Sequence, residues 1–524
     1  MSLPDPHSRK NAVALAAVCL AALMFGLEIS SVPVVLPILE KTLHGSFRDM
    51  QWIMNAYTIA CTTVLMAAGT LADRYGRKRM LVISLIVFGL TSILCGLARS
   101  VPVLVAGRFL QGLGGGAMLI CLIAILSHQF RAGRERATAF ATWGIVFGFG
   151  LGFGPILGAA IVAVSSWQWV FLVHGVLAVL AIVMTSSGVE ESRDPDARKL
   201  DIGGILTLSL AVFSSTYFIT QGPDIGFGSA AALGALALAL VSFVAFLVVE
   251  RLHPHPMFDF TVFRIRPFSG AIFGAMGMNF SFWPFMIYLP IYFQSALGYD
   301  VVTAGCSLLA YTLPTLVFPP LAERFALRYE PRAVIALGMF AIGLGFLGMR
   351  YAISVAHPSW STILPGALLA GMGLGFTNTP VTNTTTGAVP STRAGMASGI
   401  DMSARLITLA INIALMGFIL VNGIRSYLRG ALPGALDEAS LRAAAEKIAS
   451  GDLVSVRSTV PAWSTLDASG AVAHAALVHG FGTVMLYGGI GVWVLAAASF
   501  LTFGGRASTS TEWGRSDLRD AMKR

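Results

Sequence analysis

Charged residues are scarce in this chain of 524 residues, because Asp, Glu, Lys and Arg together make up only 12% of it. Soluble globular domains carry about 25% charged residues, so this composition excludes an ordinary soluble protein. The hydrophobic share is 56%. Both values are typical of an all-α protein that crosses a membrane many times.

Cysteine is also rare, and its five copies, Cys19, Cys61, Cys95, Cys121 and Cys306, lie in or at the edge of apolar runs. This placement predicts small core side chains rather than disulfides or metal ligands. The sequence shows no zinc spacing and no soluble catalytic domain, and the glycine-rich stretch 112–116 lacks the Lys-Ser/Thr pair of a phosphate-binding loop. We therefore expect neither an enzyme nor a metal or cofactor site.

The net charge of +9 does not indicate nucleic acid, because the basic residues lie in short loops between apolar runs. Such loops are typical of membrane topology signals and of contacts with anionic lipids. A membrane span needs about 20 apolar residues. The apolar runs predict fourteen spans, at residues 11–38, 51–72, 79–98, 102–126, 137–163, 167–188, 202–221, 229–250, 268–293, 302–322, 332–351, 361–386, 396–421 and 478–503.

An even number of spans puts both chain ends on one side of the membrane. Most of the 35 Lys and Arg residues lie in the tails and loops on that side, which predicts that both termini are cytoplasmic. We expect an N-terminal six-helix bundle (1–190), a linker with two additional spans (191–251), a cytoplasmic loop (252–267), a C-terminal six-helix bundle (268–503) and a cytoplasmic tail (504–524).

The C-terminal bundle includes a long external loop, 422–475. Within it, residues 437–450 have the spacing of an amphipathic helix that Gly451 would stop. Three interpretations stay open: this helix covers the outer opening, contacts a partner, or is a surface feature without a role.

A short basic turn, Gly69–Arg79, joins the second and third spans. Every position resembles the signature loop of the major facilitator superfamily of transporters. A degraded second copy, 321–325, follows the tenth span, as expected for an internally duplicated transporter. The resemblance implies two six-helix bundles and a cytoplasmic gate, which would hold the cytoplasmic side closed. Its residues would be Asp73, Arg74, Gly76, Arg77 and Arg79.

Two charged residues lie deep within apolar spans, Glu28 in the first and Arg108 in the fourth. A charge there is costly unless it has a partner or water. At 1.5 Å per residue, both fall in the outer half of the membrane, where they either meet or are satisfied separately. The first span resembles that of the fourteen-span drug:proton antiporters, although Glu28, Ser30 and Pro33 depart from their motif. The resemblance implies proton coupling by Glu28 and Arg108, and a structural role for Arg108 stays open.

The fifth span has a glycine at every second position from 148 to 154. Four residues, Gly150, Gly154, Pro155 and Gly158, resemble the antiporter motif, which implies export rather than import. Close helix packing alone would also explain these glycines.

Polar and aromatic side chains within spans usually face the bundle interior or a cavity. Candidates for substrate contact, for each of which a structural role is the more common alternative, are Asn55, Tyr57, Asn279, Trp283, Tyr288, Tyr292, Gln294, Asn378, Thr379, Asn383 and Thr384. His174 in the sixth span, where relatives usually have asparagine, either titrates near neutrality or stays neutral and buried. Asp401 and Arg405 share one helix face and form either a self-neutralising pair or part of a gate.

The resemblance to the drug:proton antiporters, together with these residues, implies a proton-coupled antiporter that exports amphipathic small molecules by alternating access, with multidrug efflux as the expected activity. Its partners would be the substrate, protons and membrane lipids, without nucleic acid, and its location a bacterial plasma (inner) membrane. A dedicated exporter of a metabolite, siderophore or lipid is the main alternative, and a sensor or scaffold that has lost transport is another. We expect a functional monomer, and the participation of a periplasmic adaptor stays open.

Overall fold

The computed structural model describes residues 6–130, 134–193, 201–253, 260–389 and 394–504. In these ranges thirteen helices are long and apolar enough to cross a membrane. A further helix, bent by 46° within the second predicted span, completes fourteen when it is counted as one. The predicted number of spans is therefore confirmed. The tail after Gly504, and parts of the predicted linker and of the loop 252–267, lie outside the described residues.

The first six spans pack into one bundle. Its helices are α1 (Pro6–Leu43), α2 (Phe47–Tyr75), α3 (Arg77–Gly96), α4 (Val101–Gln129), α5 (Arg134–Val164) and α6 (Gln168–Gly188). Helix α1 lies against α4, α5 and α6, and α3 against α4 and α6. Close approach depends on small residues, since a Cβ added at Gly112 of α4 would lie 2.4 Å from the carbonyl oxygen of Tyr57 of α2.

The second bundle contains two spans that are broken into pieces. One joins α9 (Arg266–Phe280), α10 (Phe282–Ile291) and the π-helical turn η2 (Tyr292–Ala296), and a short turn η1 (Phe260–Arg264) precedes it. The other joins α11 (Val301–Ser307), α12 (Leu309–Thr312), α13 (Pro314–Val317) and α14 (Pro319–Tyr329). Helices α13 and α14 begin at prolines, which lack the N–H that a continuous helix would use. The remaining spans are α15 (Pro331–Ile353), α16 (Trp360–Gly387), α17 (Ala394–Ala431) and α21 (Ala471–Phe503).

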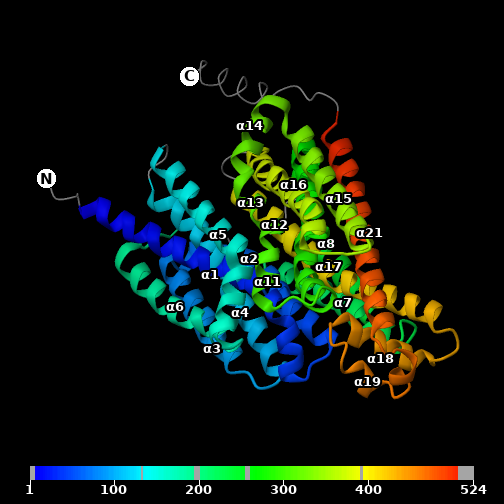
Figure 1. Cartoon of the computed structure of the whole chain (residues 1–524). Helices are drawn as coiled ribbons and strands as arrows, with labels where there is room; N and C mark the ends of the chain where they lie inside the picture. The colour runs from blue at the N-terminus through cyan, green and yellow to red at the C-terminus, as the bar shows by residue number, and fades with distance from the viewer. Residues whose placement is uncertain (1–5, 131–133, 194–200, 254–259, 390–393, 505–524) are drawn as a thin grey trace.

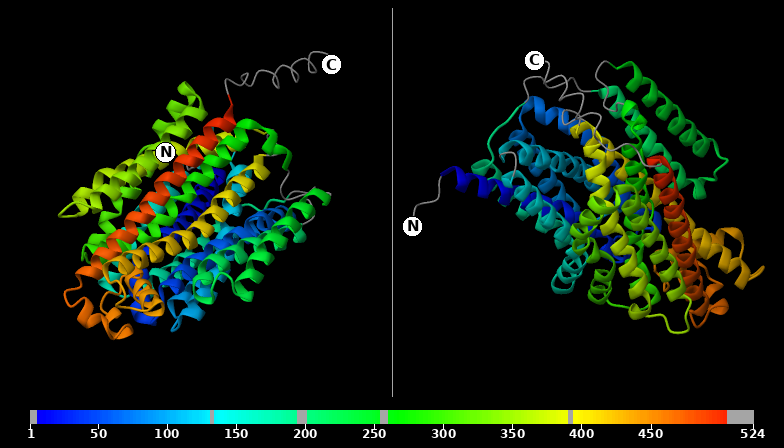
Figure 2. Two further views of the ribbon diagram at one scale, coloured as in Figure 1. Left: turned by 90° about the vertical axis from the view of Figure 1, so that its right-hand side faces the viewer. Right: turned by 90° about the horizontal axis from the view of Figure 1, so that it is seen from above.

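The two additional spans, α7 (Ile202–Ile225) and α8 (Ala230–Leu252), form a hairpin at the periphery, as Figure 2 shows. Helix α7 contacts α2 of the first bundle and α17 of the second. The side chains of Leu240 and Val241 on α8 are exposed. Because exposed apolar side chains suit hydrocarbon rather than water, this face is a lipid-facing surface.

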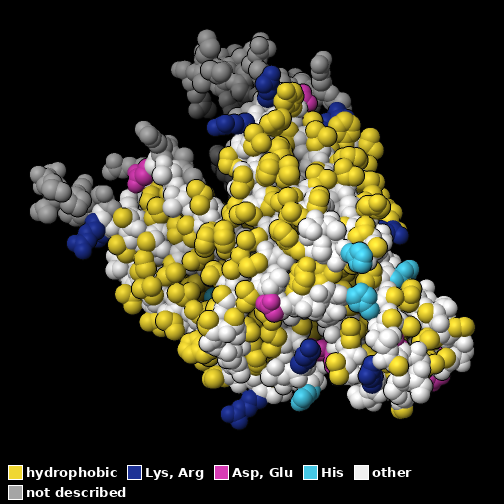
Figure 3. Space-filling model, viewed as in Figure 1, with side chains coloured by type: hydrophobic (Ala, Val, Ile, Leu, Met, Phe, Trp, Pro, Cys, Tyr) yellow, Lys and Arg dark blue, Asp and Glu magenta, His cyan; other side chains and the backbone are white. Residues whose placement is uncertain are grey.

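The two bundles meet at one end of the molecule and separate at the other (Figure 1). We call the end where α1 begins and α21 ends the inner end, and the opposite end the outer end. Figure 3 shows a notch between the bundles at the inner end. The cytoplasmic location of the inner end is still a prediction. If the inner end is cytoplasmic, the structure is an inward-facing conformation, because the bundles separate at that end.

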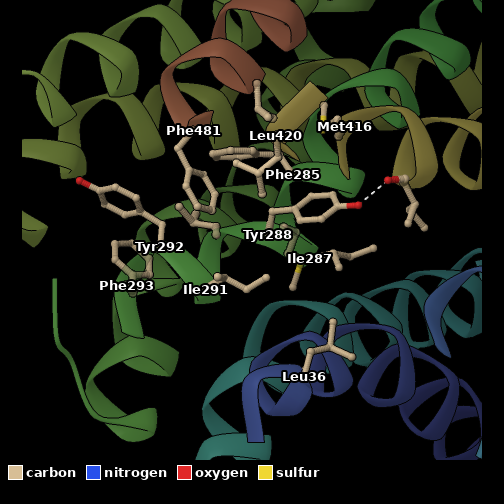
Figure 4. Packing of buried hydrophobic residues seen from close by; sticks show 14 of the residues in the cluster. Leu36, Phe285, Ile287, Tyr288, Ile291, Tyr292, Phe293, Met416, Leu420 and Phe481 are labelled. Atoms are coloured by element: carbon tan, nitrogen blue, oxygen red, sulfur yellow. Dashed lines mark hydrogen bonds between the residues drawn. The ribbon is translucent and has the colours of Figure 1, made fainter. Parts of the chain in front are cut away.

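The outer closure is held by polar bonds and a shared apolar core. Gln294 Nε2 donates to the carbonyl of Val34 (3.2 Å), and Gln51 Nε2 donates to the Tyr288 hydroxyl (3.0 Å). That hydroxyl donates in turn to the carbonyl of Ile413 on α17. Figure 4 shows Tyr288 among the buried side chains of this core, with Leu36 of α1 on the opposite side. Tyr288 thus links α2, α10 and α17.

The external loop folds into an outer cap (residues 432–470) that contains α18 (Glu438–Ala449), α19 (Val456–Thr459) and α20 (Trp463–Leu466). The predicted amphipathic helix is confirmed: Asp437 caps it, and Gly451 follows it with φ +84°. The loop is shorter than the predicted 422–475, because α17 and α21 extend beyond the apolar runs. The predicted apolar face of α18 is buried; it comprises Leu441, Ala444, Ala445 and Ile448.

The outer cap covers the outer end where the bundles meet. Lys447 Nζ lies 3.5 Å from Glu40 Oε1 of α1. Glu438 accepts hydrogen bonds from Arg425 and Arg429 of α17, and these bonds hold the pKa of its carboxyl below the ordinary value. Helix α18 is therefore tied to both bundles, which favours the covering role among the three predicted for it.

Four of the five cysteines, Cys19, Cys61, Cys95 and Cys121, are buried, as expected for small core side chains. Cys306 is exposed on α11, so the core prediction is wrong for that residue. It lies on a short helix of a broken span, where an apolar run does not imply burial inside the protein.

We expect Lys447→Glu to weaken the attachment of the outer cap, because it places a second carboxylate against the buried Glu40. An uncompensated buried partner costs about 1–3 kcal/mol, so the thermal unfolding temperature of the purified protein should fall. The double variant Glu40→Lys/Lys447→Glu should recover part of the loss. Lys41→Glu makes the same charge change at an exposed neighbouring site and serves as control; equal effects of the two single variants would contradict the prediction.

Candidate functional site

Glu28 of α1 and Arg108 of α4 form an ion pair in the interior of the first bundle. Arg108 Nη1 donates to Glu28 Oε1, and both side chains are completely buried. The sequence left open whether the two groups meet, and the structure confirms that they do. Their roles in transport stay predictions.

Three further contacts fix the Arg108 guanidinium. Its Nε donates to the carbonyl of Ile53 on α2 (3.1 Å), and Nη1 also donates to Gln111 Oε1 (2.7 Å). The guanidinium carbon lies 4.3 Å from the centre of the Tyr57 ring, a distance at which a cation and an aromatic face attract each other. Gln111 Nε2 donates onward to Ser92 Oγ of α3 (2.8 Å). Arg108 thus connects α1, α2, α3 and α4.

His174 of α6 lies on the other side of Glu28. Its Nδ1 is 3.4 Å from Glu28 Oε2 and 3.0 Å from the carbonyl oxygen of Val170. The imidazole stacks edge-on with Phe88, with ring centres 5.8 Å apart. The sequence marked His174 as a titratable group within a span, but no signal placed it beside Glu28, because that contact depends on how α1 and α6 pack.

The signature loop between α2 and α3 pairs its charges locally. Arg77 Nη2 at the start of α3 lies 2.9 Å from Oδ1 of Asp73, which is four residues earlier, near the end of α2. Gly76 has φ +116°, so the backbone favours glycine, and a Cβ there would lie 2.6 Å from Glu191 Oε1, so that side chain would have to move.

Glu191, which follows α6, is a partner of the loop that the sequence analysis missed. Its carboxylate accepts the backbone N–H groups of Lys78 (3.1 Å) and Arg79 (3.3 Å) at the start of α3. A carboxylate at a helix N-terminus satisfies free N–H groups and suits the helix dipole. Arg79 Nε is also 3.7 Å from Glu191 Oε2, and the remaining gate candidate, Arg74, is exposed.

The glycines of α5 serve two interfaces. A Cβ at Gly150 would lie 2.9 Å from the carbonyl of Leu23, and Cβ atoms at Gly154 and Gly158 would meet Ser30 and Ser31, so these three face α1. Ser30 Oγ also donates to the carbonyl of Gly150 (2.9 Å).

The opposite side of α5 contacts the second bundle. A Cβ at Gly305 of α11 would lie 2.9 Å from the carbonyl oxygen of Pro155. Thr312 Oγ1 donates to the carbonyl of Gly152 (2.7 Å). Helix α5 therefore lies between α1, which carries Glu28, and the broken span of the second bundle.

The candidate substrate residues fall into two groups. Asn279 donates to the carbonyl of Ala275 (2.9 Å), and Trp283 is partly buried. Five of the candidates are buried in the bundle cores and line no open surface in this conformation: Asn55, Tyr57, Asn279, Tyr288 and Tyr292. Asn378 and Asn383 are exposed on the inner half of α16. The polar α16 residues are thus the accessible ones.

Arg405 joins the α16 group to α17. Its Nη2 lies 3.1 Å from Asp401 Oδ2, which confirms that the two residues pair. The guanidinium also donates to Asn378 Oδ1 (2.5 Å) and Thr382 Oγ1 (3.0 Å). The pair is therefore more than self-neutralising, because it links two helices of the second bundle.

A family model described as "Major Facilitator Superfamily" matches residues 18–412 and 268–510. The chain belongs to this superfamily. It is 31% identical over 431 residues to "Multidrug resistance protein Stp" of Mycobacterium tuberculosis (strain CDC 1551 / Oshkosh), covering 82% of this chain and 80% of that protein. It is 28% identical over 500 residues to "Tetracenomycin C resistance and export protein" of Streptomyces glaucescens, covering 93% and 91%.

Solved structures show the same fold. A bacterial homolog of the human lysosomal transporter Spinster, in an inward-facing and unoccupied conformation, matches with a TM-score of 0.64 at 16% identity. The match covers 97% of this chain and 100% of that one. With its many spans and bacterial relatives, the chain is a multi-pass transporter of the bacterial plasma (inner) membrane rather than an enzyme.

We expect Gly154→Ala to destabilise the α1–α5 interface, because a Cβ there would lie 1.7 Å from Ser30 Oγ. Overpacking a close interface costs about 1–3 kcal/mol, measurable as a lower unfolding temperature. Adding Ser30→Ala should restore part of the stability. Gly144→Ala on the same helix meets nothing within 4 Å and is the matched control; the prediction fails if it is as destabilising as Gly154→Ala.

Proposed function

We propose that this transporter is a proton-coupled exporter of amphipathic small molecules that works by alternating access. The observation that carries the proposal is the completely buried Glu28, held between Arg108 and His174. A carboxyl group in a membrane interior is costly in its ionised form and readily takes up a proton. A group whose protonation changes the charge of a bundle core suits coupling of a proton to a conformational change.

The position of Glu28 supports coupling to movement of the bundles. Its helix, α1, contributes Val34 to a bond with Gln294 of the second bundle. It also packs against α5, which contacts the second bundle through Pro155 and Gly152. A change of charge at Glu28 would therefore act on two helices that form the outer closure.

The inference that the transporter exports its substrate rests on the relatives and on the glycines of α5. The relatives named above are described as multidrug resistance and export proteins, and the α5 glycines resemble the antiporter motif. Amphipathic substrates fit the exposed polar residues Asn378 and Asn383 beside apolar helix surfaces. In this scheme the inward-facing conformation takes up substrate, and the Asp73 loop closes the inner end when the outer end opens.

A dedicated exporter is the second candidate. It is favoured by the relative from Streptomyces glaucescens, whose description names a single compound and which matches over more of this chain than Stp does. Efflux assays with a panel of dyes, quaternary cations, antibiotics and host metabolites separate the two. A multidrug exporter transports several unrelated compounds, and a dedicated one transports a single class.

Glu28→Gln should lose most of the ethidium transport that a pH gradient drives in proteoliposomes, by about tenfold or more, because the amide has neither the titratable group nor the negative charge of the carboxylate. Downhill ethidium exchange without a gradient should persist. Glu40→Gln neutralises another buried acid of the same helix and should keep the ethidium transport that the pH gradient drives. If Glu28→Gln responds to the pH gradient like the parent, the proton role is wrong.

Asp73→Asn should slow turnover more than it weakens binding, because Asp73 serves the gate and is remote from the buried pair. We expect ethidium affinity within about twofold of the parent and a transport rate lower by about fivefold or more. Fluorescence binding in detergent and efflux from proteoliposomes measure the two quantities. Glu190→Gln, an exposed acid at the same end, is the control, and a loss of affinity matching the loss of rate would refute the gating role.

A further inference from the structure

We propose that His174 is a second proton-accepting group of the Glu28–Arg108 site. The exchanged proton resides on its imidazole while Glu28 stays ionised and paired with Arg108. The inference rests on the proton coupling proposed above, and it changes which atom carries the proton.

The two oxygens of Glu28 have different partners. Oε1 accepts from Arg108 Nη1, whereas Oε2 faces His174 Nδ1 at 3.4 Å and has no hydrogen-bond partner among the described residues. One carboxylate thus lies between a permanent cation and a group that becomes a cation when it is protonated. All three side chains are almost completely buried.

The imidazole has a defined place for the extra proton. Its Nδ1 is 3.0 Å from the carbonyl oxygen of Val170. Because a carbonyl only accepts, the neutral ring carries its hydrogen on Nδ1, and the lone pair is on Nε2. Nε2 is buried and has no hydrogen-bond partner among the described residues. Proton uptake at Nε2 gives an imidazolium whose Nδ1 lies 3.4 Å from Glu28 Oε2, close enough for charge attraction.

The alternative position for the proton is less favourable. A proton on Glu28 would leave the Arg108 guanidinium without a counter-charge in an apolar core, which is costly. A proton on His174 adds the same net charge but keeps the carboxylate between the two cations. The geometry therefore favours the imidazole of His174 as the first group to be protonated.

Few other charges act on this ring. Helix α1 presents Glu28, with Arg108 of α4 behind it, and α3 presents the Phe88 ring. The titratable group of α3 in this network is Cys95, which contacts Gln111 rather than the imidazole. Helix α5 has no titratable side chain in residues 137–164. Glu28 is thus the carboxylate that determines how His174 binds a proton.

The step is a reversible proton transfer without change at carbon. Nε2 takes a proton from the outer aqueous phase in the outward-facing form and releases it to the inner phase in the inward-facing form. Glu28 then acts chiefly as the anion that stabilises both neighbouring cations.

The first test observes the ring directly. In protein labelled with ¹⁵N-histidine, the resonance absent from His174→Asn belongs to His174. We expect it to report a protonated imidazole at a pH at which transport occurs, and a neutral ring at the same pH in Glu28→Gln, where the anionic neighbour is lost. A ring that stays neutral at every pH at which transport occurs overturns the proposal, and the His174→Asn variant serves only to assign the resonance.

The second test measures function. In proteoliposomes with ethidium as probe, His174→Asn should move the pH profile of transport towards lower pH by about one unit, because the proton must then bind Glu28 against Arg108. His479→Asn, the same change at an exposed residue of α21, should leave the profile in place. His174→Gln serves as a second variant of the site.

The outcomes separate the two proposals. If His174→Asn lowers the rate equally at every pH, or leaves the profile unchanged, while Glu28→Gln abolishes the drive, His174 is structural and proton coupling stands. If neither substitution alters the response to a pH gradient, proton coupling itself fails.

Discussion

A charged group in hydrocarbon persists only where the protein supplies its partners, and this requirement organises the first bundle. An arginine at the membrane centre costs about 3 kcal/mol or more. Arg108 meets that cost with Glu28 of α1, the carbonyl of Ile53 of α2 and Gln111 of its own helix. These bonds fix the relative heights of three helices. Glycines such as Gly112 then let the helices approach closely enough for the bonds to form.

The outer closure has a different character. It combines a few hydrogen bonds, those of Gln51, Tyr288 and Gln294, with a continuous apolar core that both bundles share. Opening this end breaks apolar contacts and uncharged hydrogen bonds, and it leaves no charged group of this core without a partner. The ion pair lies within the first bundle and can move as one body with it. The outer cap adds charged contacts to both bundles, and these contacts must rearrange when the outer end opens.

Much of the fold could be predicted from sequence, because hydrocarbon thickness fixes the length of a span and glycine patterns mark close helix contacts. The similar depths of Glu28 and Arg108 allowed the two groups to meet without deciding that they do, and α18 followed from its amphipathic spacing. His174 and Glu191 were not placed, since each contacts residues far away in sequence through packing that composition does not encode. Tyr288 was expected at a substrate surface, yet it is buried as a link between helices, because an aromatic side chain with one polar atom suits both environments.

The position of α7 and α8 distinguishes the two lateral boundaries between the bundles. The two bundles adjoin along two lateral boundaries, one at α2 and α17 and the other at α5 and α11–α13. Helix α7 lies against both α2 and α17, so a lipophilic compound approaching that boundary meets the hairpin first. The additional spans therefore make the two boundaries unequal: a compound in the inner leaflet would meet the hairpin at one of them and α5 at the other.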